Sequence, residues 1–227
     1  MLVLGLDTAL QRCSVAIARD GAVLAQGGID MERGHAEHLA PMVKAVLEDA
    51  QVSVADLDRI GVVVGPGGFT GVRVALSFAR GLVIGTDIPA VGVTSLAALA
   101  GNVCAPPSGL IAPVIDARRG QVYAALYGEG GEPLVPPFVA TPKEALQNLV
   151  NKAGGHSVTV LGSGAGLLGD RPLSWSAPDA PDQIDAVIVA RLAAQAQLSP
   201  GAPRPLYLRA PDAKPPRREG LKVVSGD

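Results

Sequence analysis

The sequence predicts an α/β protein of two lobes, of which the second is a reduced copy of the first. Apolar strand-like runs alternate with amphipathic helical stretches over the first hundred residues. The order β-β-β-α-β-α-β-α then begins again near residue 110. Each half opens with a strand that ends in Asp, a turn and a second strand. Such self-similarity is typical of internal duplication.

The first lobe is expected to cover residues 1–104. A continuous apolar run predicts its first strand, and the Asp20-Gly21 pair is typical of a hairpin turn between the second strand and the third. Helical spacing of apolar residues indicates the helices. The expected strands are 2–6, 13–18, 22–27, 60–64 and 88–93, and the expected helices are 35–50, 70–85 and one that starts at 95–100.

The second lobe is expected at 105–198, after a linker near 104–109, with fewer and shorter helices. Thr141 and Glu144 form the sequence pattern of a capping box at the start of a helix. Prolines place the strand at 133–139 on a sheet edge. Residues 199–227 read as a Pro-rich extended tail, in which 206–208 could dock on the body of the protein. The other expected elements are strands at 110–115, 121–127 and 158–161 and helices at 142–151 and 185–198, the last capped by Asp182 or Asp185.

The composition bounds the function. With 48% apolar and 18% charged residues, the chain of 227 residues is globular rather than disordered. A net charge of −2 and only 3% aromatic residues argue against an autonomous nucleic-acid binder. Cys13 and Cys104 lack the spacing of a disulfide framework or a zinc site. The first apolar run meets Asp7 at once, which favours a strand over a signal peptide. No apolar run approaches about 18 residues, so we expect a cytoplasmic protein without a membrane span.

The segment from residue 62 to residue 73 is the most informative part of the sequence. Three valines read as a buried strand, a glycine-rich turn follows, and an apolar stretch with helical spacing begins at Val72. A strand, such a turn and a helix start together present backbone N–H groups that favour either an anion or a closely packed neighbour. The pattern by itself leaves both alternatives open.

Several segments together resemble the TsaB family, whose members share the actin-like ATPase and sugar-kinase superfold. The similarity extends in order over nearly the whole chain, and the most specific part is the turn motif of residues 65–73, in which Gly68 stands where the family has serine. The resemblance implies two lobes with mixed five-stranded sheets. The matching segments are Leu6-Asp7-Thr8-Ala9, Cys13-Ser14-Val15-Ala16, the motif Gly65, Pro66, Gly67, Gly68, Phe69, Thr70, Gly71 and Arg73, the stretch 116–123 and Tyr207-Leu208-Arg209.

The resemblance also implies a role. TsaB proteins are regarded as non-catalytic scaffolds that pair with TsaD, a catalytic paralogue of the same fold. TsaD transfers a threonylcarbamoyl group from threonylcarbamoyl-adenylate to the adenosine beside the tRNA anticodon, and the small ATPase TsaE joins the pair. On this basis we expect no catalytic residues, and contact with tRNA only through the complex.

The family's catalytic paralogue carries a metal-binding His-x-x-x-His motif, and this sequence has Ser95 and Leu99 in its place. Leucine cannot ligate a metal and serine is a poor ligand, so we expect no metal site. Asp7, Thr8 and Asp116 are the candidates for a vestigial nucleotide site, since actin-like kinases place carboxylates near Mg²⁺ at such strand ends. The alternative is that both Asp residues cap tight turns. We expect no cofactor; weak ATP or ADP binding by a kinase-class enzyme is the competing hypothesis.

The first two long helices carry wider apolar arcs than packing on one sheet requires. Gly71, Ala75 and Ala79 recur every four residues and would let another helix approach closely. We therefore expect a helical bundle shared with the partner, or a homodimer when the chain is alone. The alternative is that loops of this chain cover the extra surface. The expected partner interface consists of Leu39, Met42, Val43, Val46, Val72, Ala75, Leu76, Ala79 and Val83.

Overall fold

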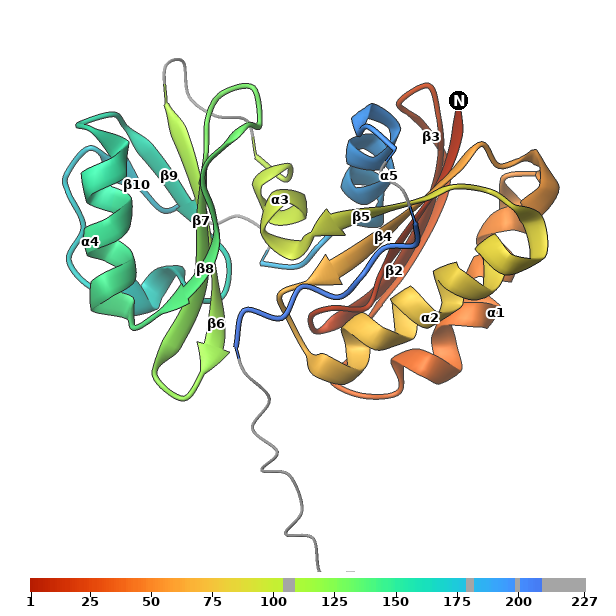
Figure 1. Cartoon of the computed structure of the whole chain (residues 1–227), viewed down its shortest axis with the longest axis horizontal. Coiled ribbons are helices and arrows are strands. Elements are labelled where there is room, and N and C mark those ends of the chain that lie inside the picture. Colours follow the sequence, from red (N-terminus) through yellow and green to blue (C-terminus); the bar gives the residue numbers. More distant parts are fainter. Residues whose placement is uncertain (104–108, 179–181, 199–200, 210–227) are drawn as a thin grey trace, which may run out of the picture.

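The computed structural model contains two five-stranded mixed sheets that face each other across a short helix (Figure 1). It describes residues 1–103, 109–178, 182–198 and 201–209. The expected linker and the tail beyond residue 209 lie outside these residues, apart from Gly109. In the described part of the chain, no helix is long and apolar enough to cross a bilayer.

The first sheet has the strand order β3-β2-β1-β4-β5, in which β1 pairs antiparallel with β2 and parallel with β4. Its centre is buried on both faces, since every residue of β1 is buried. Five strands were expected here and five are found, each within a few residues of its expected bounds. They are β1 (Leu2–Asp7), β2 (Arg12–Arg19), β3 (Ala22–Asp30), β4 (Arg59–Gly65) and β5 (Ala90–Thr94).

Two long helices, α1 (His35–Asp49) and α2 (Phe69–Thr86), lie side by side on one face of this sheet (Figure 1). Helix α1 contacts β2 and β3, whereas α2 contacts β4 and β1, and the two helices also contact each other. Each helix therefore has two buried sides, one against the sheet and one against its neighbour. A short 3₁₀ helix, η1 (Val54–Asp56), precedes β4 and was not expected from the sequence.

The opposite face of the first sheet is covered by α5 (Ala186–Gln195), which contacts β1, β2 and β4. Gly5 and Gly61 are paired in register on β1 and β4, and a Cβ atom on either would collide with the α5 backbone. The glycines thus allow α5 to pack very close to the sheet. This corrects one expectation: α5 lies in the range assigned to the second lobe, yet it packs on the first.

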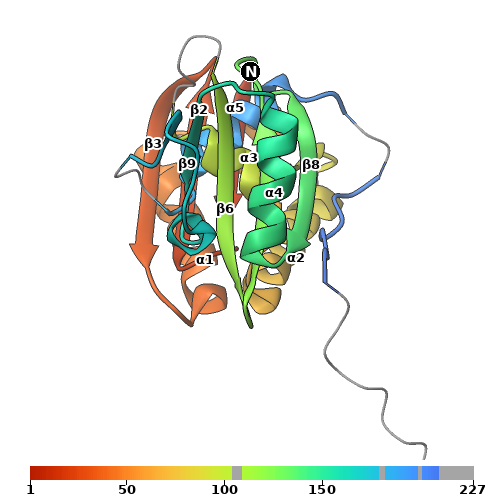
Figure 2. The same cartoon turned by 90° about the vertical axis from the view of Figure 1, so that its left-hand side faces the viewer.

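The second sheet has the order β10-β9-β6-β7-β8, which repeats the order of the first sheet strand for strand. Helix α4 (Pro142–Ala153) packs on β7 and β8, and its Thr141–Glu144 capping box is present (Figure 2). The strand with prolines, β8, lies on an edge as expected. The strands are β6 (Leu110–Arg118), β7 (Gln121–Tyr127), β8 (Pro133–Ala140), β9 (Val158–Leu161) and β10 (Trp175–Ser176).

The second lobe is reduced at the place where the first has α2. After β9 the chain forms only a 3₁₀ turn, η2 (Ala165–Leu168), and β10 is two residues long. The sequence analysis missed both elements because they are too short to show a period. Helix α3 (Ser95–Ala100) contacts strands of both sheets and fills the space between the lobes.

A C-terminal strap, residues 201–209, leaves α5 and crosses the first lobe toward the second (Figure 1). The Leu206 backbone N–H donates to the Val64 carbonyl at 2.8 Å, at the end of β4. Arg209 Nη2 donates to Gln121 Oε1 at 2.6 Å, at the start of β7. The expectation that residues 206–208 dock as an extended segment is confirmed, and the strap contacts both lobes.

Candidate functional site

The glycine-rich turn between β4 and α2 packs against the turn that follows β1. The Gly68 N–H donates to the Ala9 carbonyl at 2.8 Å. A Cβ atom on Gly67 would lie 2.5 Å from the same carbonyl oxygen, and one on Gly71 would collide with the Thr8 carbonyl. Of the two alternatives that the motif left open, the closely packed neighbour is the one present. The space that a phosphate would need is filled by the protein's own backbone.

Thr8 is part of this packing. Its hydroxyl donates to the Gly71 carbonyl at 2.6 Å and accepts from the Ala75 N–H at 3.2 Å. The side chain is completely buried. Thr8 was expected as a candidate for a vestigial nucleotide site. In the structure its hydroxyl instead bonds the start of α2 to the end of β1.

Asp7 is completely buried at the end of β1. Its Oδ1 accepts from the Ala9 N–H at 2.9 Å, an Asx turn, while its Oδ2 is buried without a hydrogen-bond partner among the described residues. Burial raises the pKa of the carboxyl to about 7, against the lowering effects of the Ala9 N–H and of Arg12. An ionised carboxylate is costly in such a place unless its oxygens are satisfied.

Asp116 occupies the equivalent position at the end of the corresponding strand of the second lobe. Its Oδ1 accepts from the Arg118 N–H at 2.7 Å, which is the same Asx turn. The carboxylate also forms an ion pair of 3.1 Å with the Arg118 side chain. Both Asp residues thus cap tight turns, as the structural alternative expected.

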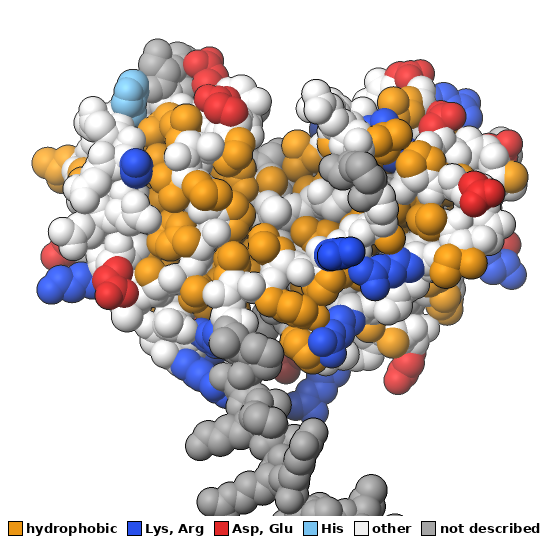
Figure 3. All heavy atoms as spheres, in the orientation of Figure 1, with side chains coloured by type: hydrophobic (Ala, Val, Ile, Leu, Met, Phe, Trp, Pro, Cys, Tyr) orange, Lys and Arg blue, Asp and Glu red, His pale blue; other side chains and the backbone are white. Residues whose placement is uncertain are grey.

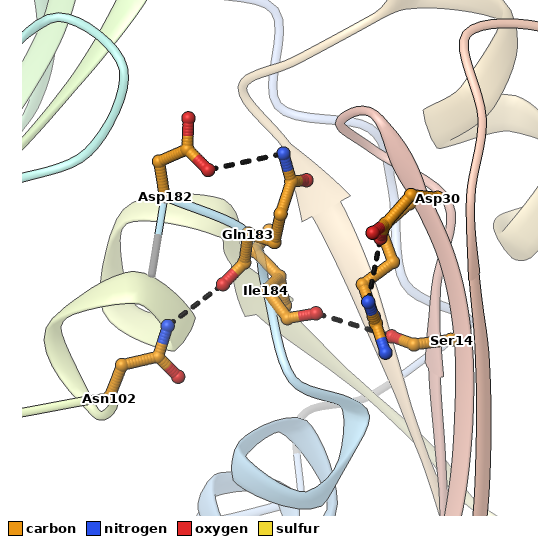
Figure 4. Close-up of polar contacts among 7 residues, drawn as sticks. Ser14, Asp30, Asn102, Asp182, Gln183 and Ile184 are labelled. Atoms are coloured by element: carbon orange, nitrogen blue, oxygen red, sulfur yellow. Dashed lines mark hydrogen bonds and ion pairs between the residues drawn. The ribbon is translucent and has the colours of Figure 1, made fainter. Parts of the chain in front are cut away.

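The segment 182–184, which lies between the lobes, packs on the first sheet where Asp7 lies (Figure 4). Ser14, which pairs with Asp7 in register, donates its hydroxyl to the Ile184 carbonyl at 3.3 Å. Asn102, after α3, donates to the Gln183 carbonyl at 2.8 Å. These bonds hold the segment 182–184 across the first sheet. The Asp7 carboxyl is thus enclosed by residues of this chain.

Ser95 and Leu99, which the sequence comparison aligned with metal-binding histidines of the paralogue, lie on α3. Both are completely buried. Within the described residues there is no group of three or more His, Cys, Asp and Glu side chains placed to hold a metal ion.

An open groove of about 480 Å³ lies between α1 and α2 on the outer surface. Its lining is mainly apolar and includes Phe69, a large apolar side chain that is 52% exposed at the start of α2. Figure 3 shows hydrophobic and cationic side chains interleaved over α2 and the strap. The groove residues are Ala36, Leu39, Phe69, Thr70, Arg73, Val74, Ser77 and Phe78.

The structure places most of the residues expected at the partner interface in the core of this chain. Of nine, only Met42 and Val83 are partly exposed. Ala75 and Ala79 approach the sheet rather than a foreign helix, since α2 packs on β4 and β1. A side chain buried in the core of its own chain offers little surface to a partner, although Leu39 also lines the groove. The residues buried in this way are Leu39, Val43, Val46, Val72, Ala75, Leu76 and Ala79.

The surface that remains available was missed in the sequence analysis. Val74 and Phe78 are half-buried and line the groove, one turn apart on α2. They follow Thr70 at intervals of four, so this stripe was readable from the helical period once the buried arc was known. Nothing in the sequence alone distinguished it from the neighbouring stripe that faces the sheet.

The strap contacts two residues of the groove lining, Phe69 and Arg73. The Arg73 guanidinium lies 3.5 Å from the centre of the Phe69 ring, and its Nε donates to the Tyr207 hydroxyl at 2.8 Å. The rings of Phe69 and Tyr207 stack with their centres 5.5 Å apart. Three residues of the expected family motifs, Phe69, Arg73 and Tyr207, therefore meet at one place on the surface.

Comparison with known proteins agrees with the motifs. The family model described as "TsaD: tRNA N6-adenosine threonylcarbamoyltransferase" matches residues 15–161. The chain is 39% identical over 127 residues to the tRNA threonylcarbamoyladenosine biosynthesis protein TsaB of Bacillus subtilis, and 37% over 128 residues to that of Escherichia coli. Each match covers 56% of this chain and 55% of the relative, so the chain spans about half the length of these curated relatives. An uncharacterized protein of Mycobacterium tuberculosis is 35% identical over 94% of both chains.

Solved structures extend the similarity over the whole fold. YeaZ from Pseudomonas aeruginosa has a TM-score of 0.70 at 29% identity, with 86% of this chain and 92% of that chain covered. The activator of 2-hydroxyisocaproyl-CoA dehydratase from Clostridium difficile has a TM-score of 0.52 at 11% identity, with 85% and 94% covered, which shows a shared fold alone.

The repeated strand order, the similar solved structures and the matching turn motif all point to the same fold and family. The two mixed sheets have the actin-like ATPase and sugar-kinase fold, and the identities of 37–39% are to proteins named TsaB. The chain belongs to the TsaB family.

Proposed function

We propose that this chain acts in tRNA threonylcarbamoyladenosine biosynthesis as a non-catalytic subunit that pairs with the catalytic paralogue TsaD. TsaD then transfers the threonylcarbamoyl group from threonylcarbamoyl-adenylate to the adenosine beside the anticodon, with TsaE as a further partner. The relatives named TsaB support the pathway. The proposal places the protein in the cytoplasm, where tRNA is modified.

The observation that carries the proposal is the apolar groove between α1 and α2. Phe69 in its lining is a large apolar side chain that is 52% exposed, and Ile84 farther along α2 is 85% exposed; exposed apolar side chains of this kind mark interaction sites. Two helices supplied by a paralogue of the same fold could cover the groove and form a four-helix bundle. Stable interfaces of that type often bury about 2,000 Å² or more.

The same face also supports a homodimer when the chain is alone. A two-fold axis would place one groove against another, which covers the same apolar side chains without the paralogue. Competition between the two pairings is therefore expected, and added TsaD should convert homodimer to heterodimer.

The test places a charge in the groove at two residues that lie outside the fully buried core. Val74→Glu and Phe78→Glu each put a carboxylate on the half-buried stripe of α2. Val150→Glu is the matched control, since Val150 is 37% exposed on α4 of the second lobe. We expect the two groove variants to lose co-purification with TsaD and the control to keep it. Circular dichroism melting checks that all three remain folded.

Two outcomes would contradict the assignment. Retained pairing in both folded groove variants would remove α2 from the interface. Equal loss in Val150→Glu would show a general effect of an added charge rather than a defined docking surface.

The proposal includes the absence of a required cofactor, and calorimetry tests it directly. Asp7 and the turn of residues 65–71 are packed by the chain's own backbone, so we expect no heat when Mg–ATP is added at millimolar concentration. Micromolar binding that disappears in Asp7→Ala would favour the competing kinase-class hypothesis instead.

A further inference from the structure

Arginine side chains gather along the strap and at the hairpin it reaches. Arg80 Nη2 on α2 donates to the strap carbonyl of Pro203 at 2.7 Å, and Arg204 follows in the strap itself. At the far end, Arg209 donates to the carbonyl of Arg118 at 3.3 Å, beside Arg119 at the tip of the β6–β7 hairpin. We call these five residues, Arg80, Arg118, Arg119, Arg204 and Arg209, the arginine band.

The strap fixes the length of the band. Residues 204–209 run without a helix or turn, and an extended chain rises about 3.3 Å per residue, so the arginines at its two ends are separated by roughly 17 Å. No acidic residue occurs in 201–209. Figure 3 shows Lys and Arg side chains over α2 and the strap and again at the lower end of the second lobe.

Four of the five residues of the band, Arg80, Arg118, Arg119 and Arg204, are exposed, whereas Arg209 is half-buried and is bonded to Gln121. The Arg118 side chain is 75% exposed although it pairs with Asp116, and Arg204 is exposed with no hydrogen bond or ion pair among the described residues. Arg118 and Arg119 have φ angles of 61° and 55°, in the left-handed region that side chains other than Gly and Asn usually avoid. A hairpin tip of this shape favours Asn and Gly, yet it carries two arginines.

Guanidinium groups bind phosphate with planar, bidentate hydrogen bonds, and a row of them matches a polyanion better than it matches a single small anion. The Tyr207 ring lies between Arg204 and Arg209 in the strap; although it stacks on Phe69, the residue remains 46% exposed and offers a further stacking surface. Basic side chains interleaved with an aromatic ring are the features of single-stranded nucleic-acid surfaces.

We propose that the arginine band binds the phosphate backbone of RNA, and that in the complex it holds part of the tRNA substrate. The inference rests on the proposed function for the identity of the RNA. It does not conflict with the net charge of −2, because the overall charge argues only against tight binding by the isolated chain.

The test uses the full chain in complex with TsaD and a fluorescent, unmodified tRNA transcript. Arg118→Ala/Arg119→Ala/Arg204→Ala removes three charges from the band. Arg19→Ala/Lys143→Ala/Lys152→Ala removes three exposed charges elsewhere and is the control. Arg118→Lys/Arg119→Lys/Arg204→Lys keeps the charge. Anisotropy titrations between roughly 50 and 200 mM salt give the affinity and its salt dependence.

We expect the band variant to bind tRNA at least about tenfold more weakly near 100 mM salt, with a salt slope smaller by about 2 to 3. The control should bind as the unmodified complex does, and the lysine variant should retain most of the affinity. Co-purification is measured first, because all three variants should still pair with TsaD.

The outcomes separate this inference from the proposed function. Normal pairing with normal tRNA affinity in the band variant overturns the inference and leaves the proposed function intact. Loss of pairing in the band variant assigns the arginines to an acidic protein surface and also overturns it. If the unmodified chain fails to pair with TsaD, the proposed function fails. The titration is then made on the chain alone, where binding that depends on the band supports the inference and its absence overturns it.

Discussion

The turn after β4 in the first lobe and the turn after β9 in the second are equivalent places in a duplicated fold. Both contain glycines that pack on the end of the first strand of their own lobe. Gly68 donates to the Ala9 carbonyl in the first, and Gly164 donates to the Val114 carbonyl in the second, at 2.8 and 2.9 Å. The glycine pattern is thus a packing device in both lobes.

The two turns differ in what surrounds the neighbouring carboxylate. Asp7 is completely buried, and Thr8 beside it is bonded to α2. Asp116 is only partly buried, and its backbone N–H donates to the Ser163 hydroxyl at 3.1 Å. In the first lobe a long helix has closed over the strand end, whereas the second lobe has only a 3₁₀ turn there. The backbone geometry has been kept in both copies while the environment has diverged.

The largest effect should come from the buried carboxylate. Burial raises the pKa of Asp7 in the folded chain to about 7 from its ordinary value of 3.8, so the folded chain holds this proton over a pH range in which the unfolded chain has lost it. Its contribution is fully present below about pH 4 and is lost as the pH rises to 7, by roughly 4 kcal/mol at 1.36 kcal/mol per unit. Asp7→Asn should remove this slope from urea unfolding measured between pH 4 and pH 8.

The corresponding variant of the second lobe sharpens the comparison. Asp116→Asn leaves Asp7 in place, so the same loss of stability with rising pH should persist. A slope that survives in Asp7→Asn and vanishes in Asp116→Asn would reverse the roles we assign to the two lobes.

A smaller effect is expected from a methyl group in the tight turn. Gly71→Ala places a Cβ atom against the Thr8 carbonyl, and we expect it to cost about 3 kcal/mol although alanine is the better helix former. Gly164→Ala, whose Cβ would lie 2.9 Å from the Ile115 carbonyl carbon, should destabilise less. Gly81→Ala on α2 meets nothing within 4 Å and should stabilise by up to about 1 kcal/mol. Denaturant midpoints rank the three, and a neutral Gly71→Ala would contradict the packing.

The smallest effect concerns the strap. Tyr207→Ala removes the ring that stacks on Phe69 and the hydroxyl that accepts from Arg73, which should cost about 1 kcal/mol. Leu173→Ala is the control, since Leu173 is 106% exposed in the second lobe and should change nothing. Thermal unfolding measures both. Identical melting of the two variants would show that the strap contributes no stability to the first lobe.

Much of the fold was predictable because its long elements carry strong local patterns. The valine run of β4, the capping box of α4 and the apolar period of α1 and α2 each determine an element type without any distant contact. The 3₁₀ turn η2 and the two-residue β10 carry no period, so they were not predictable. The apolar face of α5 shows that the helix is buried, but not which of two similar sheets it covers.

The candidate site was predictable only in part. The turn motif marked the right place, and its two interpretations could be distinguished only when Ala9 was seen to fill the turn. The expected interface residues lie mostly in the core for a different reason. The helical period shows that α2 has a wide apolar arc, but it does not show that the sheet and α1 together cover most of that arc. Ala75 and Val74 are neighbours in sequence, yet one faces the sheet and the other the groove.

The glycine pair under α5 has a consequence for how the protein is made. Gly5 and Gly61 are synthesised early, whereas the helix that rests on them ends at residue 195. During synthesis on the ribosome, one apolar face of the first sheet therefore stays uncovered until nearly the whole polypeptide has emerged. A truncated gene that stops after the first lobe would leave that face in water and would yield aggregates rather than a small stable domain.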